Sequence, residues 1–161
     1  MNHKNQVHKS IGIGLILTFS IGSALWFLLP NENYSSVPLL GLYALPLIFS
    51  TSVIIVKRYS SSRLIKAAYH KDDSLKIENA INQNNLETTV VSVLLVLSFG
   101  AITNIHFAKL VPIHLVLFLV GRAAFMVGYK VSPIDRLVGF VMSHYINLIL
   151  LVMSLYVYIY A

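Results

Sequence analysis

Two charged residues, Glu87 and Arg122, lie inside long apolar segments of the chain. A charged side chain at the centre of a membrane helix costs about 2.5–3.5 kcal/mol, so its presence there indicates a function by default. Opposite charges on consecutive helices offset part of this cost, and we therefore expect Glu87 to pair with Arg122. The structural alternative is a buried ion pair that only fixes the register of the two helices.

Two amide side chains accompany Glu87 along its helix. Gln83 lies four residues before Glu87 and Asn84 lies three before it, so we expect all three side chains on one helix face. Side-chain amides both donate and accept hydrogen bonds. This face is therefore suited to a ligand that carries amide groups of its own.

A second set of residues supplies positive charge. Tyr129 lies seven residues after Arg122, two turns along the same helix face, and Arg136 follows a short loop to begin the last helix. Guanidinium groups bind carboxylates and other anions through charge-assisted hydrogen bonds. With the amides above, these residues predict a cationic pocket that is open to the cytoplasm and suits an anionic, amide-rich, thiol-bearing ligand.

The composition decides which class of protein holds this pocket. Hydrophobic residues make up 57% of the 161 residues and charged residues 11%, against roughly a quarter charged in soluble domains. A soluble globular fold is excluded. The chain has no cysteine, so any thiol chemistry requires a thiol that belongs to a substrate. His106, His114 and His144 lie on different segments without helical pairing, and we expect no metal site.

Five apolar runs are long enough to cross a bilayer core of about 30 Å, which requires roughly 20 residues of helix. They are Ile11–Leu29, Val37–Val56, Leu86–Thr103, Leu110–Tyr129 and Leu137–Tyr160. The runs are continuously apolar rather than alternating, which indicates helices and not barrel strands. We expect the third helix to begin near residue 74, capped by Asp72 or Asp73, and to reach about residue 104. Pro46 is expected to kink the second helix.

Basic residues orient the chain. With the N-terminus in the cytoplasm, every Lys and Arg except Lys109 and Arg122 lies on the cytoplasmic side. The net charge of +6 is therefore read as topology and not as a nucleic-acid surface. We expect a multi-pass protein of a bacterial inner membrane, with the first span retained as a helix. Gly14, Thr18 and Gly22 give this span a stripe of small residues for close helix packing.

Two stretches of the sequence resemble the MAPEG family, the membrane-associated proteins in eicosanoid and glutathione metabolism. Asn84-Asn85-Leu86-Glu87-Thr88 is similar to the family's Asn-x-x-Glu motif. The stretch from Leu117 to Arg122, with Tyr129 seven residues later and Pro133-Ile134 before Arg136, is similar to the third and fourth helices of its prostaglandin E synthases. The resemblance covers roughly residues 37–160.

The resemblance implies an all-α membrane domain of four helices over residues 37–161. Residues 1–36 would add an N-terminal tail and an extra transmembrane helix. The family forms homotrimers that hold glutathione between neighbouring subunits on the cytoplasmic side. The implied ligands of glutathione are Gln83, Asn84, Glu87, Arg122 and Tyr129, and Arg136 matches the arginine that stabilises its thiolate.

The function that the resemblance implies is a membrane-bound glutathione transferase or peroxidase-like enzyme, with glutathione as co-substrate and a lipophilic electrophile arriving from the bilayer. Three positions depart from the family pattern. Gln83 stands where many members have arginine, Phe125 where the prostaglandin synthases have histidine, and Leu137 where they have serine. One alternative is a non-catalytic scaffold that binds a lipid. The other is a helical membrane subunit in which Glu87 and Arg122 are architectural.

Overall fold

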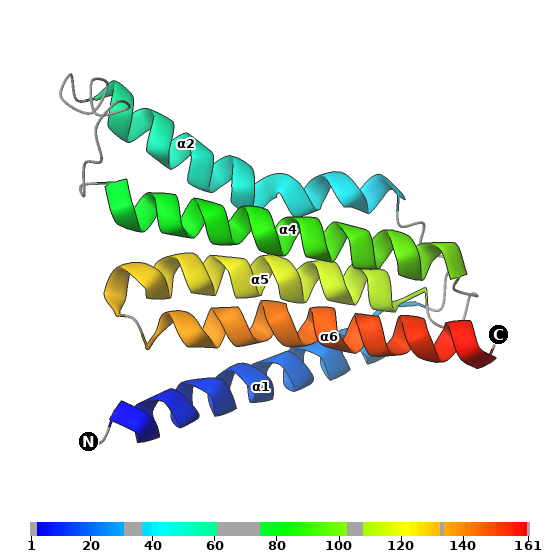
Figure 1. Cartoon of the computed structure of the whole chain (residues 1–161). Coiled ribbons are helices and arrows are strands. Elements are labelled where there is room, and N and C mark those ends of the chain that lie inside the picture. Colours follow the sequence, from blue (N-terminus) through cyan, green and yellow to red (C-terminus); the bar gives the residue numbers. More distant parts are fainter. Residues whose placement is uncertain (1–2, 31–36, 61–74, 103–107, 133, 161) are drawn as a thin grey trace.

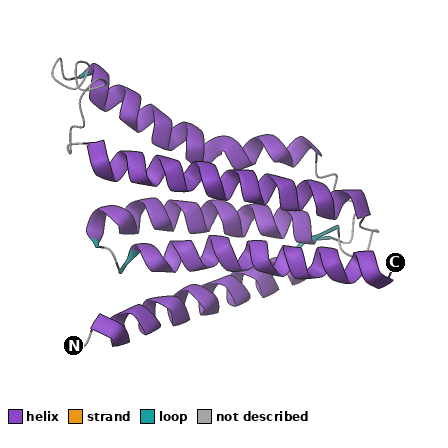
Figure 2. Cartoon of the chain, viewed as in Figure 1, coloured by secondary structure: helices purple, strands orange, loops and turns teal. Residues whose placement is uncertain are grey.

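The chain folds into long helices that lie roughly side by side (Figure 1). The structure is a computed structural model that describes residues 3–30, 37–60, 75–102, 108–132 and 134–160. Its elements are α1 (His3–Leu28), the 3-10 helix η1 (Val37–Ala44), α2 (Leu45–Tyr59), α4 (Lys76–Ile102), α5 (Leu110–Val131) and α6 (Arg136–Tyr160). Figure 2 shows only helices and short loops among these residues.

All of the predicted spans are confirmed. Five helices of the described part are long and apolar enough to cross a membrane, and the second consists of η1 and α2 together. The change from 3-10 to α-helix falls beside Pro46, where the missing N–H prevents a regular helical hydrogen bond. The polar start of α4 continues into its apolar part without a break, as predicted. Asp72 and Asp73, the expected caps, lie outside the described residues.

The pair α5 and α6 forms the centre of the bundle. α4 and then α2 lie on one side of this pair, and α1 lies on the other (Figure 1). Glycine brings α5 and α6 unusually close, because a β-carbon at Gly139 would lie 2.1 Å from the backbone nitrogen of Phe125 and 2.4 Å from the carbonyl oxygen of Gly121. No larger residue fits between the two backbones. This contact fixes the start of α6 against the end of α5.

The extra N-terminal helix packs on α6 through its stripe of small residues. A β-carbon at Gly14 would lie 2.9 Å from the carbonyl oxygen of Val138, so α1 approaches α6 backbone to backbone. Thr18 is buried and donates from Oγ1 to the Gly14 carbonyl oxygen at 2.8 Å. Small residues are the usual means by which membrane helices approach each other closely. The predicted close packing is therefore confirmed at Gly14, whereas a β-carbon at Gly22 would meet only Leu117 of α5 at an ordinary distance of 3.5 Å.

Charge separates the two ends of the bundle. One end, called the basic end (left in Figure 1), carries Lys57, Arg58, Lys76, Lys130 and Arg136 at helix termini. The opposite end carries Lys109, which precedes α5. Large apolar side chains such as Phe27, Ile55 and Val127 are exposed on the helix surfaces between the two ends. An apolar girdle between polar ends is what a multi-pass membrane protein presents to lipid.

Candidate functional site

A cavity of about 270 Å³ opens between α4, α5 and α6 at the basic end. Its lining residues are Ala80 and Asn84 of α4, Phe125 and Tyr129 of α5, and Arg136, Leu137 and Phe140 of α6. The fold thus brings Asn84, Tyr129 and Arg136 together from three helices, as the predicted pocket requires. Such a cavity, mostly apolar with a few convergent polar groups, is typical of a small-molecule site.

Arg136 is held in place by the tight α5–α6 contact. A β-carbon at Gly128 would lie 2.7 Å from the backbone nitrogen of Arg136, so the first residue of α6 rests directly on α5. The guanidinium carbon lies 4.7 Å from the centre of the Tyr129 ring, a cation–π distance. Within the described part of the chain, the Arg136 side chain has no hydrogen bond or ion pair. Its donors are therefore available to an anion in the cavity.

Asn84 contributes an acceptor that the protein does not use. Its Oδ1 is buried and has no hydrogen-bond partner among the described residues. The other buried side-chain atom in this condition, Nε of Arg58, belongs to the last turn of α2 and does not line the cavity. A buried acceptor without a donor costs about 1–3 kcal/mol, so Asn84 is suited to a ligand that brings an N–H group.

The predicted ion pair between Glu87 and Arg122 is wrong. Arg122 is fully buried, and its Nε donates to Oδ1 of Asn85 at 2.9 Å. Its Nη2 donates to the same oxygen, and Nη1 reaches Oγ1 of Thr88 at 3.5 Å. Glu87 is exposed and accepts a hydrogen bond from Nε2 of Gln83 at 2.8 Å. Arg122 is therefore a buried cation held by an amide and a hydroxyl rather than by a carboxylate.

Helix geometry explains this outcome. Asn85 and Glu87 are two residues apart, so their side chains point roughly 200° apart around α4. Asn85 belongs to the buried stripe of α4 and Glu87 to its exposed face. The stripe itself was readable in the sequence, since Ile81, Asn85, Ser92, Val96 and Phe99 recur at helical spacing. That signal identifies Asn85 as the residue that faces α5.

Gln83 and Glu87 remain on the outer surface of the protomer, away from the cavity. Their i, i+4 hydrogen bond confirms that they share a helix face, while Asn84 turns toward α5 and α6. The predicted single face is therefore split into an exposed pair and one cavity residue. Whether the pair binds glutathione stays a prediction, because a site between subunits would use exactly such outward groups of one protomer.

Two aromatic rings connect the two arginines. The guanidinium carbon of Arg122 lies 4.1 Å from the centre of the Phe125 ring, and that ring meets Tyr129 edge to face at 5.4 Å. Tyr129 in turn lies under Arg136. Phe125 thus separates the buried cation from the cavity and leaves Arg136 as the arginine that lines it. Arg122 supports this wall, and its predicted direct contact with glutathione stays a prediction.

A second polar cluster, which the sequence did not reveal, lies among α4, α5, α6 and η1. Oη of Tyr43 is 2.6 Å from Nδ1 of His114, and Nε2 of His114 is 2.7 Å from Oδ1 of Asn147. The same oxygen accepts from Oγ of Ser92 at 2.9 Å. A carbonyl oxygen only accepts, so Nε2 donates to it, and in the neutral ring Nδ1 accepts from Tyr43. The residues of this cluster, called the buried network, satisfy one another.

The buried network also accounts for one of the histidines considered as metal ligands. His114 is fully buried with both ring nitrogens engaged, and His144 is exposed on α6, where it stacks on Phe140. His106 lies outside the described residues. Within the part of the chain that the structure describes, no group of His, Asp and Glu is arranged to hold a metal ion.

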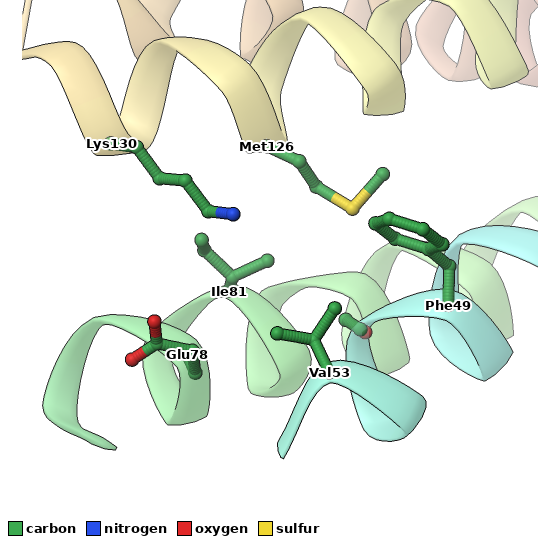
Figure 3. Close-up of a pocket in the computed structure, with 7 residues that line it drawn as sticks. Phe49, Val53, Glu78, Ile81, Met126 and Lys130 are labelled. Atoms are coloured by element: carbon green, nitrogen blue, oxygen red, sulfur yellow. The ribbon is translucent and has the colours of Figure 1, made fainter. Parts of the chain in front are cut away.

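A smaller cavity between α2, α4 and α5 has a different character. In Figure 3, Lys130 and Met126 of α5 lie on one side of it and face four residues of the other two helices, namely Glu78 and Ile81 of α4 and Phe49 and Val53 of α2. Glu78 is buried and forms an ion pair with Lys57. The volume of this cavity is about 20 Å³, which is room for about one water molecule. It is therefore too small to hold a peptide-sized ligand.

Comparison with known proteins identifies one family. The sequence model of the MAPEG family matches residues 37–156, which span η1 to the last turn of α6 and exclude α1. Searches of curated proteins and of solved structures gave no significant match. The matched region contains every residue that lines the cavity of about 270 Å³.

Proposed function

The chain belongs to the MAPEG family, and from this premise we propose that it is a membrane-bound glutathione transferase or peroxidase-like enzyme that acts on lipophilic electrophiles. Family membership and the five apolar helices support a multi-pass membrane protein of the glutathione and eicosanoid metabolism family. The proposal adds the substrate and the reaction. The observation that carries it is Arg136, a cation without an anionic partner among the described residues, lining a cavity beside an unpaired buried acceptor.

The cavity offers groups that match those of glutathione. The tripeptide carries backbone amides, carboxylates and one thiol. Oδ1 of Asn84 would accept from an amide N–H, and the donors of Arg136 would bind the negative centre. In a homotrimer, the exposed pair Gln83 and Glu87 of one subunit would meet the part of the ligand that extends toward it. Glu87 would there pair with the α-amino group.

The role of Arg136 follows from the acidity of thiols. A free thiol has a pKa near 8.5, so only about 3% is thiolate at pH 7. A guanidinium at hydrogen-bond distance favours the anion, and a pKa of about 6.5 would raise that fraction to about 75%. The thiol proton leaves to solvent at the basic end, and the thiolate sulfur forms a bond to the electrophilic carbon of the second substrate. Either the leaving group on that carbon departs with its bonding electron pair, or a conjugated double bond opens and takes up a proton from solvent. Tyr129, which lies under the guanidinium, fixes its position.

The rest of the cavity wall suits the second substrate. Phe125, Leu137 and Phe140 give the cavity an apolar side, and Phe140 is exposed at the surface of α6. A lipophilic electrophile would enter past this residue from the bilayer, while glutathione would enter from the cytoplasm. The two substrates would then meet at Arg136 from different phases.

The deciding experiment is the ultraviolet difference absorbance of the glutathione thiolate on detergent-purified protein at pH 7. We expect a thiolate signal in the wild type and its loss in Arg136→Ala. Lys130→Ala is the matched control, because Lys130 is a cation at the same end that does not line this cavity. Glutathione binding is measured separately by equilibrium dialysis.

The outcomes separate the alternatives. Loss of the signal in Arg136→Ala but not in Lys130→Ala supports the enzyme. Binding of glutathione without any thiolate signal supports the non-catalytic scaffold, which the apolar side chains of Phe125 and Leu137 would favour. Absence of binding in the wild type overturns the glutathione proposal altogether.

A further inference from the structure

An apolar groove runs between the extra helix α1 and the pair α5–α6. Its volume is about 360 Å³, within the range of small-molecule sites, and its lining is predominantly apolar. The groove walls include Gly22 and Trp26 of α1, Ile113 and Leu117 of α5, and Ile146 of α6. Because the family match begins at residue 37, this groove exists only where α1 is added to the family domain.

Glycine keeps the groove open. Gly22 lines it, and a β-carbon there would meet only Cδ1 of Leu117 at 3.5 Å, an ordinary contact. Two turns earlier, Gly14 lies against α6 with no room for a β-carbon. In Figure 1, α1 lies apart from α6 at its N-terminal end and passes behind α6 toward the opposite end. Beyond Gly14, the groove between α1 and the pair α5–α6 is bounded by side chains that suit a hydrocarbon chain.

A buried cation lies beside the groove, at the end of the bundle opposite the basic end. Lys109 is 7% exposed and adjoins Leu110, which lines the groove. Its Nζ donates to the carbonyl oxygen of Trp26 at 3.3 Å and lies 5.5 Å from the centre of the Trp26 ring. Within the described residues it has no carboxylate partner. One carbonyl and one ring leave a buried ammonium short of acceptors.

We propose that the groove binds an anionic phospholipid, with one acyl chain between α1 and α5–α6 and the phosphate on Lys109. The apolar walls would pack on the acyl chain, and the Lys109 ammonium would bind the phosphate. The two parts of the site would thus bind two parts of the same lipid. Trp26 lies where the chain joins the headgroup, the depth at which tryptophan is enriched in membrane proteins. The site is independent of the glutathione cavity, which lies at the basic end.

Three alternatives to a bound phospholipid exist, and the experiment must separate them. The contact of Lys109 with Trp26 is a C-terminal cap of α1, which alone stabilises a helix end. Glu32, in a segment outside the described residues, is the nearest acidic residue in sequence to the end of α1. A second copy of the chain is the third alternative, as an occupant of the apolar groove. Each of these makes a different prediction for lipid selectivity.

The test uses full-length protein in detergent, equilibrated with equal amounts of phosphatidylglycerol and phosphatidylcholine that carry identical acyl chains. Native mass spectrometry counts the lipids retained. We expect the wild type to prefer phosphatidylglycerol, and Lys109→Gln to reduce that preference about fivefold. Glutamine can still donate to the Trp26 carbonyl, so the cap is preserved. Lys9→Gln, at the other end of α1, is the matched charge control and should leave the preference unchanged.

Steric variants test the chain-binding half. Gly22→Leu fills the groove and should lower retention of both lipids, and Ser23→Leu provides a second variant on the same wall. Gly12→Leu is the control, since a β-carbon at Gly12 meets nothing within 4 Å. The proposal is overturned if the wild type retains the two lipids equally. It is also overturned if Glu32→Gln raises the preference for phosphatidylglycerol, because Glu32 and not a phosphate is then the partner of Lys109 in the wild type. It is also overturned if Gly22→Leu changes the oligomeric mass instead of lipid retention.

Discussion

Polar side chains are paired with one another in the buried network but lack hydrogen-bond partners among the described residues in the cavity at the basic end. In the buried network, His114 uses both ring nitrogens and Oδ1 of Asn147 accepts two hydrogen bonds. In the cavity, Oδ1 of Asn84 is buried without a donor among the described residues, and the Arg136 side chain contacts the Tyr129 ring without a hydrogen bond to that part of the chain. Burial of an unpaired polar group costs free energy, so a fold retains one where a ligand completes it.

Arg122, like the buried network, has its hydrogen-bond partners inside the protein, although a buried charge in a membrane helix suggests a functional site. It is fully buried, and its principal acceptor is Asn85, which also donates to the Pro46 carbonyl oxygen at 3.1 Å. One amide thereby connects α5 with the start of α2. In this protein, a buried charge is thus by itself weaker evidence of a ligand site than a buried hydrogen-bond acceptor without a donor.

The largest expected effect tests whether Arg122 is structural. Asn85→Leu removes the main acceptor of a buried guanidinium, and we expect the free energy of unfolding in detergent micelles to fall by about 3 kcal/mol or more. The double variant Asn85→Leu with Arg122→Leu should recover much of this loss, because both polar partners are then gone. Chemical denaturation measures both. A double variant as unstable as the single one would contradict the pairing.

The next effect tests how the tight helix contact positions the cavity. Gly139→Ala forces α5 and α6 apart, because its β-carbon would lie 2.1 Å from the Phe125 nitrogen. We expect a loss of about 1–3 kcal/mol in the free energy of unfolding and a weaker glutathione thiolate signal, since Arg136 moves with α6. Gly12→Ala, which has open space, should leave the signal unchanged. An unchanged thiolate signal in Gly139→Ala would show that this helix contact does not position Arg136.

The membrane spans and part of the cavity could be predicted from the sequence, but the partner of Arg122 was predicted wrongly. The spans were predictable because a continuous apolar run of bilayer length has one stable solution. Asn84, Tyr129 and Arg136 were predictable through motif spacing alone. The partner of Arg122 was missed although the buried stripe of α4 contains Asn85, because the rule that opposite charges pair ignores the rotation of about 200° between Asn85 and Glu87. An amide satisfies a cation without leaving any charge pattern in the sequence.

The buried network was out of reach for a related reason. Its members, Tyr43, Ser92, His114 and Asn147, come from four elements and share no spacing along the chain. Only the three-dimensional packing brings them within hydrogen-bond distance. Single polar residues in apolar helices gave no indication of whether each would be paired inside the bundle or would face a ligand.

A smaller effect measures how strongly the buried network holds the bundle. His114→Ala and Asn147→Ala, with the double variant, form a mutant cycle for the hydrogen bond between their side chains. Hydrogen bonds between membrane helices average about 0.6 kcal/mol with a maximum near 1.7 kcal/mol, and we expect coupling within that range. Glutathione binding should be unchanged in all three variants. A change in binding would mean that the network and the cavity are not independent.

The smallest expected effect has the opposite sign and tests the comparison most sharply. Asn84→Leu removes a buried acceptor that has no partner among the residues that the structure describes, so the ligand-free protein should keep its free energy of unfolding or gain up to about 1 kcal/mol. The same variant loses the hydrogen bond offered to glutathione, and its Kd should rise up to about tenfold. Asn147→Leu should behave in reverse, with lower stability and unchanged binding. If both variants lose stability equally, Asn84 is a structural residue after all, and the open acceptor is completed within the fold or by a neighbouring subunit.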